Sequence, residues 1–155
     1  MRPYFEKMPG FGKPLKENRI ARSKDSRSKL EAVEATIAAA RKAKENVGIP
    51  AAKINERGSL TVWQRLEYLV DPGTWQPLHS IYNPEDNEEG TTNVVDGLGK
   101  ISGRWAVIIG FDNKVLAGAW IPGQAENVLR VTNLAKRLHI PLVWLVNCSG
   151  VKLPD

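Results

Sequence analysis

The sequence predicts an α/β domain in which a β-hairpin, a helix and a further strand follow one another. The hairpin is indicated by two strand-like segments, residues 93–101 and 104–111, joined by Ser102-Gly103. The helix is indicated by an apolar period of about 3.6 residues over positions 124–138. The last strand is the apolar run 142–146, which is too continuous for a strand with one wet face and suits an inner strand covered on both sides. These observations define a β-β-α unit with a strand behind it.

Length and composition restrict the protein to a single soluble domain. The chain has 155 residues, of which 42% are hydrophobic and 25% charged. Its apolar stretches are far shorter than the roughly 20 residues of a membrane helix, and its charged N-terminus lacks a signal-peptide core. The single cysteine, Cys148, excludes an intrachain disulfide and favours a reducing cytoplasm.

The net charge of +5 is unevenly distributed. Residues 1–57 hold 14 basic and 7 acidic side chains, whereas residues 58–155 hold 8 and 10. A basic arm can bind nucleic acid, but here acidic residues are mixed in, and the aromatic residues precede the densest charge. We therefore predict no nucleic-acid partner, and the alternative is a solvated helix that lies over another subunit.

The segment before the hairpin predicts an arm followed by two helices. Residues 1–27 lack periodicity and predict an extended arm. Ser28 and Glu31 form a capping box that predicts the start of a long helix, which ends at Gly48 and Pro50. Its apolar face comprises Leu30, Val33, Ile37, Ala40 and Val47. A second capping box, Thr61 and Gln64, predicts a helix over 62–70. We divide the chain into an arm with a helix, 1–57, and a domain, 58–155.

The remaining elements complete the predicted unit. We expect a strand over 74–82, weakened by a proline, then an acidic loop over 83–90 that is solvated rather than metal-binding. Asp112-Asn113 indicates another hairpin, with a third strand over 114–120. The inward face of the last helix comprises Val128, Val131, Leu134, Ala135 and Leu138. An inner final strand needs a second neighbour, so either a partner completes the sheet or the chain is the N-terminal piece of a longer protein, which we favour.

The candidate reaction centre is Ser149-Gly150-Val151, directly after the last strand. Ligands of α/β sheets bind beyond the carboxyl ends of strands, and main-chain N–H groups there can donate to a substrate oxygen. Cys148 is a possible nucleophile, but neither histidine offers a base, so a buried inert thiol is the favoured interpretation. Ser149 lacks the preceding glycine of a hydrolase elbow, because position 147 is Asn, and its hydroxyl is expected to brace the turn.

Three motifs resemble one known family. Gly58-Ser-Leu-Thr-Val-Trp-Gln-Arg and the later Leu-Val-Asp-Pro-Gly-Thr-Trp75 are similar to the Gly-Lys-Leu-Thr-Ala-Arg-Glu-Arg and Leu-Leu-Asp-Pro-Gly-Ser-Phe signature of biotin-dependent acyl-CoA carboxyltransferases. Gly97-Leu-Gly-Lys-Ile-Ser-Gly-Arg104 resembles the Gly-x-Gly-x-Ile-Asn-Gly-Arg hairpin of that family, and Asn147-Cys-Ser-Gly-Val151 its Asn-Asp-Ser-Gly-Gly. The resemblance implies a crotonase-like (ClpP/crotonase) spiral of β-β-α units, of which residues 58–155 form the truncated start.

The resemblance also implies a chemistry and site residues. Family members move a carboxyl group between an acyl-CoA and biotin, and backbone N–H groups hold the thioester enolate oxygen. The first donor corresponds to Gly150 or Val151, and the second lies downstream, so the isolated chain should be inactive. Lys152 either contacts a CoA phosphate or is solvated. Ile121 and Gly123, which follow a predicted strand end, either line the CoA channel or form a structural turn. Ser149 adjoins the substrate.

Cofactors and partners are likewise implied by the resemblance. Biotin is carried on a separate subunit, acyl-CoA is the substrate, and no metal is expected. Cys148, Val151 and Lys152 depart from the carboxylases and favour the decarboxylase branch, whose members act on glutaconyl-CoA within sodium-pumping complexes. This branch implies a biotin carrier subunit, an integral-membrane decarboxylase subunit, a homodimer at full length, and a cytoplasmic location at the inner membrane face. Alternatives are a propionyl- or methylcrotonyl-CoA carboxylase subunit, a crotonase-type hydratase or isomerase, and a non-catalytic scaffold.

Overall fold

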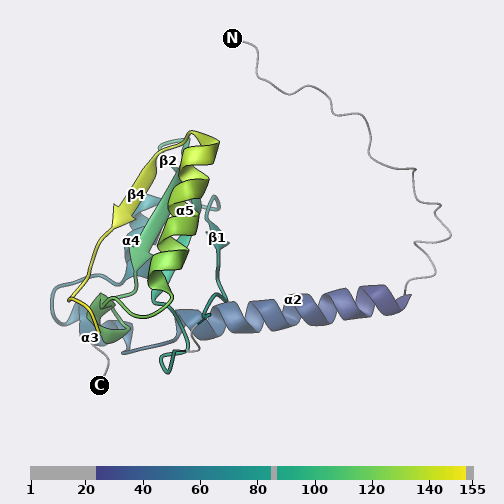
Figure 1. Ribbon diagram of the computed structural model, residues 1–155, viewed down its shortest axis with the longest axis horizontal. Coiled ribbons are helices and arrows are strands. Elements are labelled where there is room, and N and C mark those ends of the chain that lie inside the picture. The colour runs from purple at the N-terminus through teal and green to yellow at the C-terminus, as the bar shows by residue number, and fades with distance from the viewer. Residues whose placement is uncertain (1–23, 85–86, 153–155) are drawn as a thin grey trace, which may run out of the picture. The chain divides into compact units, whose positions relative to one another are not determined.

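A mixed four-stranded sheet with a helix on each face organises the protein (Figure 1). The computed structural model describes residues 24–84 and 87–152, and it separates into two compact units, residues 1–36 and 37–155. The elements are α2 (Lys24–Glu45), α3 (Ala51–Asn55), α4 (Val62–Leu69), β1 (Gln76–Leu78), β2 (Val94–Ile101), β3 (Arg104–Phe111), the 3₁₀ helix η1 (Leu116–Gly118), α5 (Gln124–Leu138) and β4 (Leu142–Leu145).

In the first unit, the described residues are the opening turns of α2. The helix begins at Lys24, so the predicted start at Ser28 is wrong, and residues 24–27 are helical rather than extended. A capping pattern inside a helix-favouring segment does not by itself stop the helix from extending further toward its N-terminus. Leu30 and Val33 are exposed, so the predicted apolar face is not buried there. The rest of the predicted arm, residues 1–23, lies outside the described residues.

The sheet has the order β1-β2-β3-β4. β1 pairs with β2 and β2 with β3 in antiparallel fashion, and β3 pairs with β4 in parallel. The β2–β3 hairpin confirms the sequence prediction, since Ile101 faces Arg104 across a two-residue turn. Ser102 and Gly103 have φ of 51° and 79°, as the favoured hairpin turn requires. The predicted helix 62–70 and its Thr61–Gln64 capping box are also confirmed.

The hairpin turn is fastened to the end of α4 by one carboxylate. The oxygens of Asp71 accept hydrogen bonds from the N–H groups of Ser102 at 3.0 Å and Gly103 at 2.7 Å. The Asp71 N–H in turn donates to the carbonyl of Lys100 at 2.8 Å. The Asp-Pro-Gly turn noted in the sequence therefore joins the helix to the hairpin, which is a structural role.

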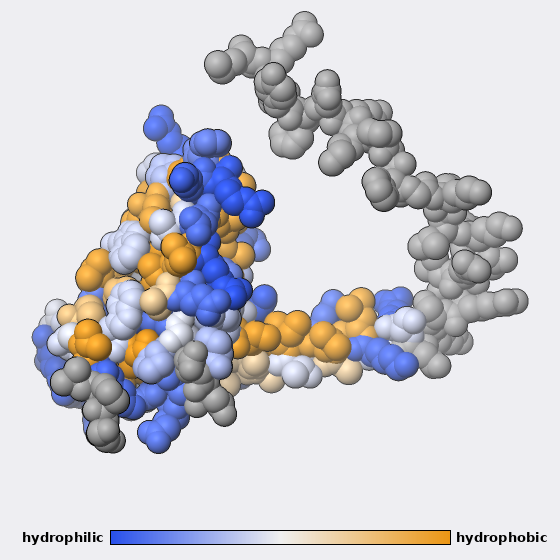
Figure 2. All heavy atoms as spheres, viewed as in Figure 1, coloured by the Kyte–Doolittle hydropathy of each residue, from blue (hydrophilic) through white to orange (hydrophobic). Residues whose placement is uncertain are grey.

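Two apolar cores lie on opposite faces of the sheet. On the α5 face the core comprises Val94, Val107, Ile109, Phe111, Val128, Val131 and Ala135. On the α4 face it comprises Val62, Leu66, Val70, Val95, Ala106 and Ile108. Burial on both faces explains why β3 reads as a continuous apolar run. The predicted inward face of α5 is wrong at Leu138, because its side chain is exposed. Hydrophilic residues cover the outward face of this helix (Figure 2).

The predicted strand 114–120 is wrong. Asp112 accepts the N–H of Lys114 through its side chain at 3.0 Å and the N–H of Val115 through its carbonyl at 3.0 Å, which turns the chain. Leu116, Ala117 and Gly118 then have φ of 46°, 51° and 76°, and three successive left-handed residues cannot form a strand. The segment is η1, and Trp120 alone makes an isolated β-bridge.

The predicted outer strands are also only partly correct. The strand predicted over 74–82 is limited to β1, which contains Pro77 and lies at the sheet edge, and His79 leaves it with φ of 44°. β4 confirms the predicted last strand, but it is not an inner strand in the part of the chain that the structure describes. Its second edge is unpaired there, and Trp144 and Val146 are exposed.

A buried ionic cluster joins α2, the end of β1 and β2 within the second unit. Oδ1 of Asp96 lies 3.0 Å from Nδ1 of His79, and the carboxylate is buried. The ammonium of Lys44 donates to the carbonyl of Val94 at 2.8 Å. Burial lowers the pKa of Lys44, and burial raises the pKa of Asp96, against the opposing effects of His79 and Lys44. The cluster therefore stabilises the position of three elements at a cost in desolvation.

The raised pKa of Asp96 makes stability depend on pH. Because the folded state holds this proton more tightly than the unfolded chain, the free energy of unfolding should fall as the pH rises from the ordinary value of 3.8 through the folded-state pKa. Asp96→Asn removes this group, so the difference in unfolding free energy, wild type minus variant, should decrease across that window. Urea unfolding between about pH 3.5 and 7 measures it. A difference that is constant with pH would contradict the assignment.

Candidate functional site

The segment after β4 runs beside the segment that follows η1. The N–H of Trp120 donates to the carbonyl of Gly150 at 2.7 Å, and the N–H of Lys152 donates to the carbonyl of Trp120 at 2.9 Å. These two bonds make a parallel β-bridge between Trp120 and Val151. The candidate loop is therefore held in a defined register by main-chain groups, beyond the carboxyl end of β4.

This register decides which way the Val151 N–H points. Along an extended chain, the N–H and C=O groups of successive residues alternate between the two edges. Since Gly150 and Lys152 bond toward Trp120, the main-chain groups of Val151 point away from it. Across the described residues, the Val151 N–H donates to no other group. The Val151 N–H is thus directed away from Trp120. The bridge does not fix the direction of the Gly150 N–H, which likewise donates to no main-chain group among the described residues.

Three contacts support the loop from beneath. The hydroxyl of Ser149 donates to the carbonyl of Leu116 at 3.1 Å, in agreement with the bracing role expected for it. The thiol of Cys148 lies 3.3 Å from the carbonyl of Gly150. A Cβ added at Gly118 would lie 1.8 Å from the carbonyl oxygen of Asn147, so only glycine allows this approach. Cys148 itself is exposed, and the prediction of a buried thiol is wrong, because the loop lies at the surface rather than inside the sheet.

Lys152 lies at the end of the loop and faces the acidic segment that follows β1. Its ammonium lies 2.9 Å from Oε1 of Glu89. The hydrogen bond from Lys152 lowers the pKa of Glu89, and the pair is partly exposed. Lys152 is therefore neither simply solvated nor free for a phosphate in this arrangement, and contact with CoA requires it to exchange partners.

Ile121 and Gly123 lie in the turn that leads into α5. The side chain of Ile121 is 2% exposed. Gly123 has φ of 79° and packs close to Pro84, whose Cγ would lie 3.0 Å from an added Cβ. Both residues therefore have structural contacts inside the described part of the fold. Their part in a CoA channel stays a prediction.

Two buried amides hold this turn, and the sequence analysis did not single them out. The amide nitrogen of Asn93 donates to the carbonyl of Ala119 at 2.6 Å, and Gln124 lies 2.5 Å from Oδ1 of Asn93. Oε1 of Gln124 accepts the N–H of Ile121 at 3.3 Å. The only signal in the sequence was a pair of polar residues at element starts, which is ordinary for caps and turns.

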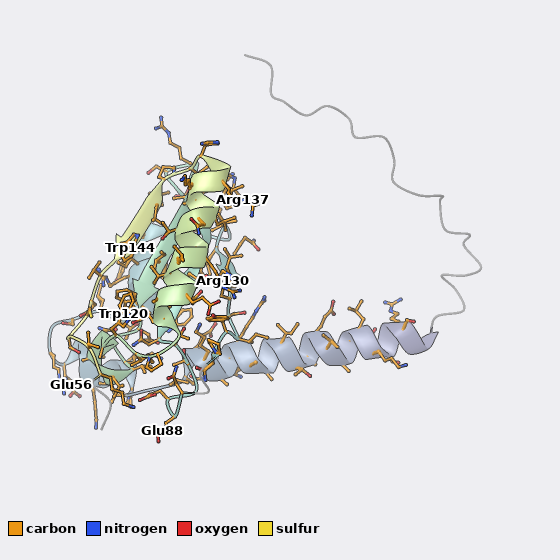
Figure 3. All side chains as sticks on the ribbon, viewed as in Figure 1. Glu56, Glu88, Trp120, Arg130, Arg137 and Trp144 are labelled. Carbon is orange, nitrogen blue, oxygen red and sulfur yellow. The ribbon has the colours of Figure 1, made fainter. Side chains whose placement is uncertain are left out.

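An aromatic cluster lies under the bridge. The ring of Phe111 contacts Trp120 edge-on at 5.9 Å and Trp144 at 6.2 Å between centroids. Figure 3 shows Trp144 and Trp120 along the same flank, beside α5. The end of β3, β4 and the bridge are thus joined by side chains as well as by main-chain bonds.

Within residues 24–84 and 87–152, no three metal-ligating side chains come together. Among these residues, too, no helix has the length and apolar character needed to cross a membrane. The loop after β4 offers a main-chain N–H donor, a kind of group that suits the stabilisation of negative charge on a carbonyl oxygen.

The fold places the chain in a structural class. A β-β-α unit followed by a further strand is the crotonase-like arrangement of the carboxyltransferases, as predicted. Solved structures of the same fold include transcarboxylase 12S with hydrolysed methylmalonyl-CoA bound, at a TM-score of 0.70 and 21% identity over 79% of this chain and 26% of that one. The β subunit of geranyl-CoA carboxylase from P. aeruginosa has the same fold at a TM-score of 0.60. It is 23% identical, and the match covers 96% of this chain and 27% of that one.

Sequence relatives identify the family. The carboxyl transferase domain matches residues 53–154. The glutaconyl-CoA decarboxylase subunit alpha of Acidaminococcus fermentans is 46% identical over 98% of this chain and 25% of its own length. The methylcrotonoyl-CoA carboxylase beta chain of Dictyostelium discoideum is 32% identical over 63% of this chain and 17% of its own length. The chain belongs to the carboxyl transferase family of biotin-dependent acyl-CoA carboxylases and decarboxylases, and it spans about a quarter or less of the length of these relatives.

Proposed function

We propose that this chain forms the N-terminal part of an acyl-CoA carboxyltransferase and that the Val151 N–H is one of its two oxyanion donors. The observation that carries the proposal is the Trp120–Val151 bridge, which directs this N–H away from the fold. Residues 1–57 would form an arm and helix, and residues 58–155 the start of the catalytic domain, an interpretation that the match over 53–154 supports. Ser149, Lys152, Ile121 and Gly123 would adjoin the bound CoA ester.

The proposed reaction moves a carboxyl group from the acyl unit to biotin. The carbon–carbon bond between the carboxyl group and the acyl unit breaks. Its electron pair stays on the acyl unit, which becomes an enolate with its negative charge on the thioester oxygen. Biotin on a separate carrier subunit would supply the ureido nitrogen that receives the carboxyl carbon, and the proton lost from that nitrogen would balance the proton that the enolate takes up. The Val151 N–H stabilises the developing oxyanion without a proton transfer of its own.

The substrate we propose is glutaconyl-CoA, because the 46% identical relative is named for it and its match extends over nearly the whole chain. The partners would then be a biotin carrier subunit, an integral-membrane decarboxylase subunit of a sodium pump, and a second copy in a homodimer. The location would be the cytoplasmic face of the membrane. The second candidate is a carboxylase subunit for methylcrotonyl-CoA or propionyl-CoA, which relatives at 32% and 23% identity support.

A chimera tests the proposal. Residues 1–152 of this chain would replace the corresponding part of the Acidaminococcus fermentans alpha subunit, and release of carbon dioxide from glutaconyl-CoA would be measured with and without free biotin as acceptor. We expect biotin-dependent turnover by the chimera and none by the isolated chain. A folded, assembled chimera that binds glutaconyl-CoA and does not turn it over would contradict the catalytic proposal. Biotin-dependent release of carbon dioxide from 3-methylglutaconyl-CoA or methylmalonyl-CoA, the carboxylated products of those carboxylases, and not from glutaconyl-CoA would favour the carboxylase alternative.

A further inference from the structure

The candidate loop, residues 149–151, is held in register by Trp120, and the residues on both sides of Trp120 are held by buried amides. The residue before it, Ala119, accepts from Nδ2 of Asn93 at 2.6 Å. The residue after it, Ile121, donates to Oε1 of Gln124 at 3.3 Å. We propose that Asn93 and Gln124 are positioning residues that fix the Val151 N–H in its outward direction. This inference rests on the proposed function of Val151 and adds the residues that make it effective.

Backbone hydrogen bonds hold Asn93 in place. Its side chain is 1% exposed, and its backbone has φ of 51°, a conformation that Asn tolerates better than most residues. Its N–H is bonded to Oγ1 of Thr91 at 3.1 Å, and its carbonyl accepts the N–H of Asp112 at 2.8 Å. The amide therefore projects from a backbone that is anchored to the start of β2 and the end of β3.

Gln124 completes the chain of bonds. It is the first residue of α5 and is fully buried. Its Nε2 donates to Oδ1 of Asn93 at 2.5 Å while its Oε1 accepts from Ile121. This pattern requires each side chain to offer a donor and an acceptor on two separate atoms, which the uncharged carboxamides of Asn and Gln supply. A carboxylate at either position would place two acceptors against each other.

The network controls the loop because it surrounds the residue that sets the register. Trp120 bonds to Gly150 and Lys152, the residues on either side of Val151. If the turn at 119–121 shifts, both bridge bonds lengthen together and the Val151 N–H loses its fixed direction. A preorganised donor is effective because it does not reorient during the reaction, so the network acts on the rate rather than on folding alone.

Native-state hydrogen exchange on the 155-residue chain tests this. We expect Gln124→Glu to raise the exchange rates of the Trp120 and Lys152 amides about 10-fold or more, since one lost buried hydrogen bond changes an opening equilibrium by that order. Amides of the β2–β3 hairpin should change less than about twofold. Gln76→Glu makes the same chemical change at an exposed site in β1 and should change neither set.

The pH dependence separates positioning from packing. Protonation of the introduced carboxyl restores a donor toward Asn93, so lowering the pH should return the Trp120 and Lys152 amides toward wild-type protection after correction for intrinsic exchange. If Gln124→Glu does not fold, Asn93→Asp gives the same readout, because it replaces the donor to Ala119 by an acceptor and keeps the acceptor for Gln124.

Uniform loss of protection across the sheet, or unchanged Trp120 and Lys152 amides, would overturn the inference. The readout uses no substrate, so it is independent of the outcome of the chimera experiment.

Discussion

Replacing Val151 by proline should lower carboxyl transfer in the chimera about 10²–10³-fold, mainly in kcat, because one oxyanion donor is removed. Proline has no N–H, and the wild-type N–H bonds to no described residue, so the fold loses no hydrogen bond of its own. Both bonds of the bridge use Gly150 and Lys152 and remain possible in the variant. The rate loss would therefore come from the site and not from the loop's attachment.

The matched control is Val151→Ala, which keeps the N–H and shortens the exposed side chain. We expect its kcat to stay within a few-fold of wild type. Steady-state kinetics of glutaconyl-CoA decarboxylation in the chimera provide the measurement, and the affinity for the CoA ester serves as a check of binding. Equal kcat values for the proline and alanine variants would show that the donor lies elsewhere, with Gly150 as the next candidate.

Much of the fold follows from local signals in the sequence. The Thr61–Gln64 capping box, the Ser102-Gly103 hairpin and the buried face of α5 each depend on residues within a few positions of one another. Such patterns specify capping bonds, positive φ or a helical stripe directly. The motif after β4 likewise located the candidate donor, because the position past a strand end is defined by the chain order alone.

The errors occur where distant contacts decide the conformation. Residues 114–120 look like a strand because they are apolar, but the Asp112 turn and the approach of Asn147 to Gly118 select a 3₁₀ helix instead. The exposure of Cys148 likewise depends on how the loop leaves the sheet.

The Asn93–Gln124 pair shows the same limit within the site. The two residues are 31 positions apart, and only the folded chain brings their amides to 2.5 Å. Their role is visible once the bridge at Trp120 is known. A polar residue that supports a loop from behind carries no motif of its own. The sequence therefore indicated the candidate donor but not the residues that we propose hold it.

Gly118→Ala should destabilise the protein by about 2–5 kcal/mol and detach the loop formed by residues 149–151, since two costs combine. An alanine with φ near 76° costs about 1–2 kcal/mol, and steric overpacking adds about 1–3 kcal/mol when neighbours must move. The neighbour here is the carbonyl of Asn147, which is backbone and cannot rotate away as a side chain would. Urea unfolding measures the first effect, and exchange of the Lys152 amide measures the second.

Gly103→Ala is the control that separates the two costs. Gly103 has φ of 79°, nearly the same as Gly118, but an added Cβ there meets nothing within 4 Å. Gly103→Ala should therefore lose only the stability that a left-handed alanine costs, about 1–2 kcal/mol, and it should leave the Lys152 amide protected from exchange. If the two variants lose the same stability and the same protection, the close approach of Asn147 does not hold the loop, and the bridge at Trp120 alone fixes the direction of the Val151 N–H.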